Sequence, residues 1–148
     1  MKKIKILLSL SLLIYFNGYS MKSDSAILEH LRYIKYVLDS LGVEEPIYVL
    51  AQAKYESGNF KCKDCSWKYN NMFGFKGQSG KYLKFDTQND CLVYYSKWQK
   101  IRYPKYKSKH PNGTYIGFLK WCKYAVNPVY GQHIQKSHDW ILKNLHNY

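Results

Sequence analysis

The clearest candidate for chemistry is a glutamate in an apolar setting, Glu56, in the stretch AQAKYESGNF (residues 51–60). The chain has 10 Asp and Glu against 23 Lys and Arg, so a carboxyl group among apolar side chains needs a reason. On a helix, Val49, Ala53 and Glu56 occupy positions i, i+4 and i+7 and share one face. Apolar neighbours and the negative end of the helix dipole both raise the pKa of Glu56. A carboxyl group that stays protonated near neutral pH can act as a general acid toward a glycosidic oxygen.

Local structure explains the other acids. Helix caps, solvated helix positions and an exposed loop account for Asp24, Glu29, Asp39, Glu44, Glu45, Asp64, Asp86, Asp90 and Asp139. Glu56 also has a structural alternative, in which its carboxyl group bonds to the backbone of a neighbouring loop or pairs with a lysine. Spacing alone leaves both interpretations of Glu56 open.

Hydrophobic periodicity predicts a mainly α, or α+β, domain that would hold this glutamate at the end of its second helix. A small β-hairpin or irregular lobe is expected within Cys62–Phe85, where GFKGQSGKYLKF interrupts the periodicity. The third helix opens with Thr87 followed three residues later by Asp90, which is close to a capping-box pattern. On this helix, Cys91, Tyr94, Tyr95, Trp98 and Ile101 are expected on one buried face. The five predicted helices are residues 25–41, 46–57, 87–101, 113–125 and 127–145, with Pro46 and Pro128 at first helical positions and Gly42 and Gly58 at helix ends.

The N-terminal stretch MKKIKILLSLSLLIYFNGYS (residues 1–20) has the pattern of a signal peptide. It combines a Lys-rich start, an apolar run and the small residues Gly18 and Ser20 at the −3 and −1 positions of a cleavage site. The apolar run is shorter than the roughly 20 residues of a membrane span, and an uncleaved anchor is the alternative. We therefore expect a secreted or periplasmic protein, with one domain over residues 21–148 and no membrane span after cleavage.

Charge and cysteine content narrow the class further. The net charge is +13, but the lysines are scattered and the chain is expected to be exported, so we expect no nucleic-acid partner. The basic surface suits solubility and attraction to anionic envelope polymers. Four cysteines, Cys62, Cys65, Cys91 and Cys122, predict two disulfides in an oxidising compartment. A zinc site at CKDC is the rival interpretation, but it lacks a second ligand pair, so no metal or cofactor is expected.

The chain contains four blocks in order: AQAKYESGNF (51–60), NNMFGFKG (70–77), YLKFDTQNDCLVYYSKW (82–98) and YAVNPVYGQHI (124–134). These blocks resemble the glucosaminidase-domain family, the bacterial endo-β-N-acetylglucosaminidases of glycoside hydrolase family 73. The resemblance extends from about Glu44 to Leu142. It implies a lysozyme-like fold of about five helices, in which a small β-hairpin lobe forms a substrate cleft. It also implies cleavage of β-1,4 bonds after N-acetylglucosamine in the glycan strands of peptidoglycan.

The resemblance also assigns roles to individual residues. Glu56 falls on the family's catalytic acid, and Tyr124 on a tyrosine near the cleft that could orient an acetamido group or a water. Asn71, Phe73 and Gly74 fall on the substrate-binding NNxFG turn. There Asn71 would bind an acetamido group or brace the turn, Phe73 would line the floor, and Gly74 would allow close backbone approach. Core or bracing roles are the alternatives for these residues.

One departure from the family bears on mechanism. Several members carry a second acid in the small lobe, but the segment from Met72 to Phe85 contains none. Asp86 and Asp64 are the nearest candidates for a base, which an inverting enzyme places roughly 6.5–9.5 Å from the acid. The alternative, which we favour, is attack by the substrate's own 2-acetamido oxygen. Asn127 also stands where the family usually has Asp.

Within this fold the cysteines are expected to pair as Cys62–Cys65 and Cys91–Cys122. The first pair lies in the loop after the catalytic helix, and the second would join the core faces of two helices and contribute about 2–4 kcal/mol. Two other functions stay open beside hydrolysis. They are a non-catalytic glycan-binding or scaffold domain of the cell envelope and a lytic transglycosylase.

Overall fold

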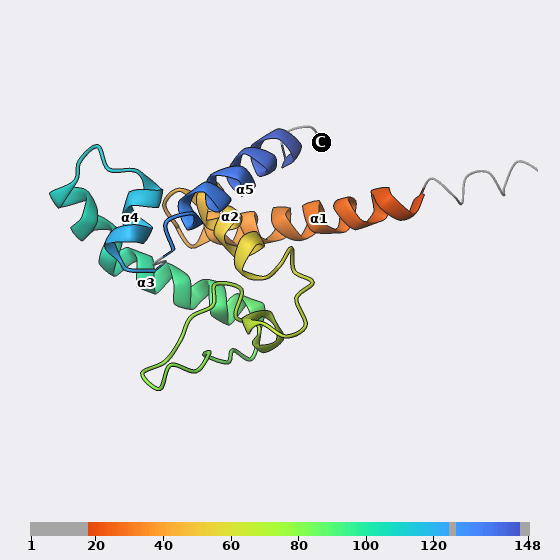
Figure 1. The fold of residues 1–148 in the computed structure, drawn as a ribbon, viewed down its shortest axis with the longest axis horizontal. Helices are drawn as coiled ribbons and strands as arrows, with labels where there is room; N and C mark the ends of the chain where they lie inside the picture. Colours follow the sequence, from red (N-terminus) through yellow and green to blue (C-terminus); the bar gives the residue numbers. More distant parts are fainter. Residues whose placement is uncertain (1–17, 125–126, 146–148) are drawn as a thin grey trace, which may run out of the picture.

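The computed structural model describes residues 18–124 and 127–145, with side chains from Ser25 onward. This part of the chain is mainly helical (Figure 1). It contains five α-helices and one short 3-10 helix. The predicted number of helices is therefore confirmed. The elements in chain order are α1 (Gly18–Ser40), α2 (Pro46–Glu56), η1 (Ser66–Tyr69), α3 (Gln88–Lys109), α4 (Tyr115–Trp121) and α5 (Tyr130–Leu145).

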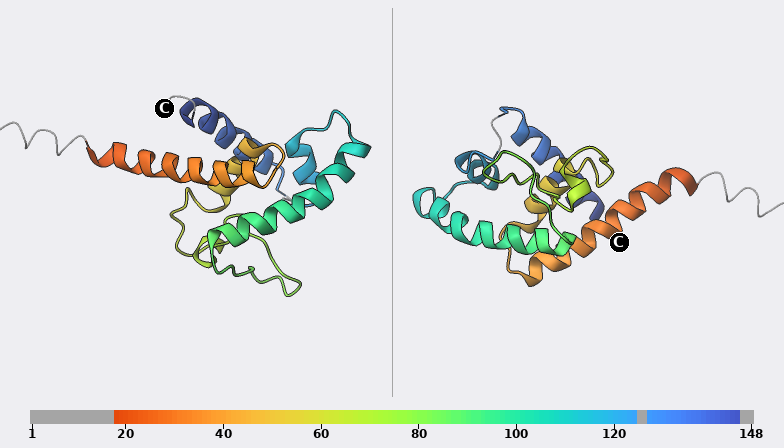
Figure 2. Two further views of the ribbon diagram at one scale, coloured as in Figure 1. Left: turned by 180° about the vertical axis from the view of Figure 1, so that it is seen from behind. Right: turned by 90° about the horizontal axis from the view of Figure 1, so that it is seen from below.

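The central element is α2, which packs chiefly against α5 and also against α1. Residues 49–53 of α2 are all buried, so the helix is enclosed on several sides and not only along one stripe. A second group of contacts joins α3 to α1 and α4. The N-terminal turns of α1 project away from the other helices (Figures 1 and 2). Glu56 follows this buried stretch at the C-terminal end of α2 and lies half-buried at the edge of the core.

Local sequence signals explain where the helices start and stop. Pro46 occupies the start of α2, where its missing N–H costs nothing. Gly42 follows α1 with φ +63° and Gly58 follows α2 with φ +57°, left-handed conformations that glycine adopts without strain. At α3, the predicted capping box forms, because Thr87 Oγ1 accepts from Asp90 N–H at 3.1 Å and Asp90 Oδ2 accepts from Thr87 N–H at 3.0 Å.

Several boundaries differ from the prediction. α1 begins at Gly18 instead of residue 25, and α3 continues through Pro104 to Lys109 instead of ending at residue 101. The last helix begins at Tyr130 and not at Pro128. Asn127 closes a turn before it, since its Oδ1 accepts from Val129 N–H at 3.0 Å and its carbonyl from Tyr130 N–H at 3.1 Å.

The predicted buried face of α3 is wrong at two positions. Ile101 is 58% exposed and Tyr94 is 41% exposed, whereas Tyr95 is fully buried. The buried side includes Gln99, a polar residue that sequence periodicity does not select. Its side chain bonds to the backbone N–H and carbonyl of Glu44, both at 2.8 Å, which satisfies its amide and fixes this face toward α1 and α2.

No strand occurs within the described ranges, so the predicted β-hairpin is not shown and the irregular lobe, the other form that the sequence allowed, is found. A single antiparallel bridge, between Lys76 and Tyr82, forms around the GQSG turn, and Leu83 N–H donates across it to the Phe75 carbonyl at 2.9 Å. The pairing goes no further, because the Leu83 carbonyl accepts from the Asn71 side chain at 2.9 Å and Phe85 N–H donates to the Tyr69 carbonyl at 3.0 Å.

The predicted signal peptide falls mostly outside the described residues. Only residues 18–20 of its span are described, as the first residues of α1, so cleavage after residue 20 stays a prediction. Among the helices that are described, none has the length and apolar character needed to cross a bilayer.

Candidate active site

Glu56 is the last residue of α2, and its carboxyl group is held from two sides. Tyr130 O–H donates to Glu56 Oε1 at 2.9 Å. On the other side the backbone of Gly74 comes so close that a Cβ added there would lie 3.4 Å from Glu56 Oε2. Among the acids whose side chains are described, Glu56 is the only one that is not exposed. The structure therefore singles out the same acid as the sequence.

Burial raises the pKa of Glu56, and the hydrogen bond from Tyr130 opposes this shift only in part. The direction agrees with the sequence prediction. A carboxyl group with a raised pKa remains protonated at higher pH and can donate its proton. Once the proton has left, the Tyr130 hydroxyl stabilises the carboxylate that remains.

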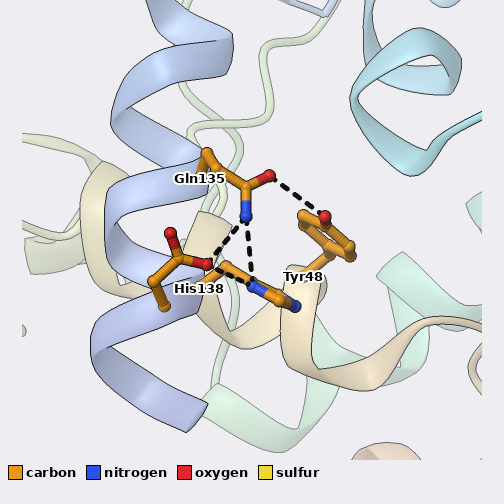
Figure 3. Close-up of polar contacts among 4 residues, drawn as sticks. Tyr48, Gln135 and His138 are labelled. Atoms are coloured by element: carbon orange, nitrogen blue, oxygen red, sulfur yellow. Dashed lines mark hydrogen bonds and ion pairs between the residues drawn. The ribbon is translucent and has the colours of Figure 1, made fainter. Parts of the chain in front are cut away.

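A polar cluster two turns along α5 fixes this helix against α2, as Figure 3 shows. Tyr48 O–H donates to Gln135 Oε1 at 3.1 Å, and the rings of Tyr48 and His138 stack with centroids 4.0 Å apart. Gln135 Nε2 in turn donates to Asp139 Oδ1 at 2.8 Å. Because α5 is held there by α2, Tyr130 at the start of α5 is kept opposite Glu56.

Tyr130 is the site residue that sequence reasoning missed. It is buried, and its contact with Glu56 spans 74 residues of sequence, so no local pattern indicates it. The one available signal was its place as the last tyrosine of the block YAVNPVY.

Asn71 braces the loop that carries Gly74. It is fully buried, and its Nδ2 donates to the carbonyls of Phe75 at 2.8 Å and Leu83 at 2.9 Å. Its Oδ1 accepts from Phe75 N–H at 2.9 Å. All of its amide groups are used within the protein, which favours the bracing role over the acetamido-binding role; substrate binding by Asn71 stays a prediction. At Gly74, φ is +69° and the backbone lies close to the Glu56 carboxyl group, whereas its approach to a substrate stays a prediction.

Phe73 and Tyr124 support the same loop. Phe73 is fully buried, with its ring centroid 4.1 Å from that of Tyr95, so it belongs to the core and does not line a floor. Tyr124 O–H donates to the Phe73 carbonyl. Burial raises the pKa of Tyr124 well above its usual value, and Glu56 adds to this shift through its nearby charge. Tyr124 thus lies near the acid, but its hydroxyl holds the backbone beside Gly74, and its catalytic role stays a prediction.

Neither predicted second acid bonds to Glu56. Asp64 and Asp86 are both exposed. Asp86 stands just before α3, where its backbone carbonyl accepts from Asn70 Nδ2 at 2.9 Å. Across the described residues, no other Asp or Glu bonds to the Glu56 carboxyl group or shifts its pKa, and a role for Asp64 or Asp86 as a base stays a prediction.

All four cysteines are free thiols in the structure, so neither predicted disulfide is shown. Cys91 lies in the first turn of α3 against the backbone of Met72 and Phe73, whereas Cys122 caps the C-terminal end of α4 and feels the charge of Arg102. The Cys91–Cys122 pairing therefore stays a prediction. Cys62 and Cys65 are in contact, since Cys65 Sγ lies 3.6 Å from the Cys62 carbonyl oxygen.

Two cavities in the described part of the chain lie away from the Glu56 carboxyl group. The larger of the two, about 650 Å³, lies between the α1–α2 turn and α3, and the smaller, about 270 Å³, lies between α1 and the chain that follows α2. Neither is lined by Glu56, so the expected cleft beside this acid stays a prediction. The larger cavity includes Glu44, Glu45, Gln99 and Lys100, and the smaller includes His30, Phe60 and Trp67.

A mainly helical domain that shields one carboxyl group is consistent with a lysozyme-like glycoside hydrolase. The family model Glucosaminidase, described as mannosyl-glycoprotein endo-beta-N-acetylglucosaminidase, matches residues 32–141. The chain belongs to this glucosaminidase family, which indicates glycoside hydrolase activity on a glycan. No curated protein and no solved structure gives a significant match to the chain.

Proposed function

We propose that the protein is a peptidoglycan hydrolase that cleaves β-1,4 bonds after N-acetylglucosamine, with Glu56 as the general acid. The observation that carries this proposal is the Glu56 carboxyl group, which is half-buried and whose pKa is raised by that burial. It occurs in a chain of the glucosaminidase family. Its partners would be glycan strands of the cell wall, reached by export through the predicted signal peptide.

The proposed reaction needs one carboxyl group from the protein. Glu56 gives its proton to the glycosidic oxygen while the substrate's 2-acetamido oxygen attacks the anomeric carbon and the bond to the leaving sugar breaks. The Glu56 carboxylate then takes a proton from the water that opens the cyclic intermediate. Two features support this route over a two-acid mechanism: Asp64 and Asp86 are exposed, and Tyr130 is placed to stabilise the carboxylate.

A non-catalytic glycan-binding or scaffold domain is the second candidate. The observation that favours it is that neither cavity described above includes Glu56. This candidate predicts that the protein sediments with cell-wall glycan and leaves it intact.

Digestion of purified sacculi, followed by mass spectrometry of the released muropeptides, tests the proposal. We expect fragments with N-acetylglucosamine at the reducing end. Intact glycan with co-sedimentation would favour the scaffold, and an anhydro-muramic product would indicate a lytic transglycosylase instead.

Tyr130→Phe tests how the site controls the acid. The substitution removes the hydrogen bond that lowers the pKa of Glu56, so this pKa should rise further. Because a general acid works in its protonated form, the falling alkaline limb of kcat/KM should move to higher pH. The pH dependence of cleavage of soluble glycan fragments measures this shift. Tyr36→Phe, at a position that is 72% exposed, is the matched control. A limb that stays in place or moves to lower pH would contradict the assignment.

A further inference from the structure

The loop between α2 and η1 carries two cysteine thiols that lie side by side. Cys65 Sγ donates a weak hydrogen bond to the Cys62 carbonyl oxygen at 3.6 Å, and the two thiols are close enough for each to shift the pKa of the other. The chain bends through Lys63 and Asp64 between them. Both thiols are half-buried and free. A disulfide between them would close a loop with only two intervening residues, in a segment that lies outside the α-helices.

The four thiols differ in how readily they form the thiolate, which is the nucleophile in disulfide exchange. The hydrogen bond from Cys65, with help from nearby backbone groups, lowers the pKa of Cys62. Burial and the bond to Cys62 raise the pKa of Cys65. Burial also raises the pKa of Cys91 to about 12 and that of Cys122 to about 11. Cys62 is thus the most reactive thiol, and its neighbour is placed to react with it second.

We propose that Cys62 and Cys65 form a redox pair that changes between a dithiol and an intrachain disulfide by exchange with a disulfide-bearing oxidant. The Cys62 thiolate attacks one sulfur of the oxidant, whose S–S bond breaks, and the leaving thiolate takes up a proton. The Cys65 thiol then loses its proton and attacks the Cys62 sulfur, which releases the oxidant's second thiol. Two electrons pass from the cysteine pair to the oxidant.

The bridge forms in the segment that joins the candidate acid to the loop that faces it. Cys62 N–H donates to the carbonyl of Ser57, the residue after Glu56, at 3.2 Å. Cys65 directly precedes η1, which begins at Ser66. The Ser66 hydroxyl lies close to Gly74, because a Cβ atom added to Gly74 would be 3.8 Å from Ser66 Oγ. The redox chemistry itself does not depend on glycan cleavage, so it can be tested separately.

Equilibration of the full chain with glutathione tests the pair. The protein is incubated at increasing ratios of oxidised to reduced glutathione and quenched with acid, and its free thiols are alkylated and located by mass spectrometry. We expect the Cys62–Cys65 bridge to accumulate as the oxidised share rises and to disappear on return to reduced glutathione, while Cys91 and Cys122 stay alkylatable. Absence of this bridge at every ratio, or a bridge to Cys91 or Cys122, would overturn the proposal.

Two single variants test the order of attack. Cys65→Ser keeps the attacking thiol and removes the resolving one, so a persistent glutathione adduct should form on Cys62. Cys62→Ser is the matched control, and its adduct on Cys65 should form at least about tenfold more slowly. Equal rates, or faster reaction at Cys65, would show that the two thiols do not have these roles.

Discussion

Glu56→Gln is expected to lower glycan cleavage by about 10²–10⁴-fold, the range that a positioned general acid contributes. Glutamine has nearly the same size and can still accept the hydrogen bond from Tyr130, but it has no proton to give. Initial rates on sacculi or soluble glycan fragments measure the loss. A variant that keeps wild-type activity would show that another group supplies the proton.

The same variant should fold at least as stably as the wild type. Burial raises the folded-state pKa of Glu56 above its ordinary value of 4.5, so the folded protein holds this proton more tightly than the unfolded chain. The contribution of protonated Glu56 to the free energy of unfolding is fully present below about pH 4.5 and is lost as the pH rises through the raised pKa. Glutamine does not ionise, so the Glu56→Gln variant avoids this loss. Its melting temperature should equal or exceed that of the wild type at pH 7 and match it at low pH. A large loss of stability at pH 7 would favour a structural role for Glu56.

Asn71→Ala is expected to destabilise the fold by roughly 2–4 kcal/mol, because it leaves two buried backbone groups without their partner. These groups are Phe75 N–H and the Leu83 carbonyl, both bonded to the Asn71 amide. The melting temperature should fall on the order of 10 °C, and activity should fall with it because the Gly74 loop loses its brace. Thermal unfolding monitored by circular dichroism measures the change.

Gln78→Ala, at an exposed position in the same loop, is the matched control and should leave the melting temperature nearly unchanged. A stable Asn71→Ala variant with weakened glycan binding would instead support the substrate-binding role that the family resemblance implied.

Sequence reasoning was most successful where one local interaction fixes the structure. The Thr87–Asp90 capping box, Pro46 at the start of α2 and Gly58 after its end all formed as predicted. Glu56 was also predictable, because an acid on an apolar helix face has few explanations. These signals lie within a few residues of one another, so tertiary contacts had little opportunity to override them.

The sequence failed where distant segments decide the structure. Tyr130 reaches Glu56 only because α5 packs along α2, and Gln99 is buried only because the backbone of Glu44 satisfies its amide. The hairpin prediction failed for a similar reason, since Asn71 bonds to the Leu83 carbonyl. In each case a polar group found a partner far away in sequence, which periodicity cannot show.

The central claim is that Glu56 is protonated where an ordinary glutamate is ionised. Titration of its side-chain carboxyl carbon by NMR measures this directly, with the signal assigned by its absence in Glu56→Gln. We predict a midpoint above the ordinary glutamate value of 4.5. A midpoint at or below that value would contradict the account, because the side chain would then carry no proton to donate near neutral pH.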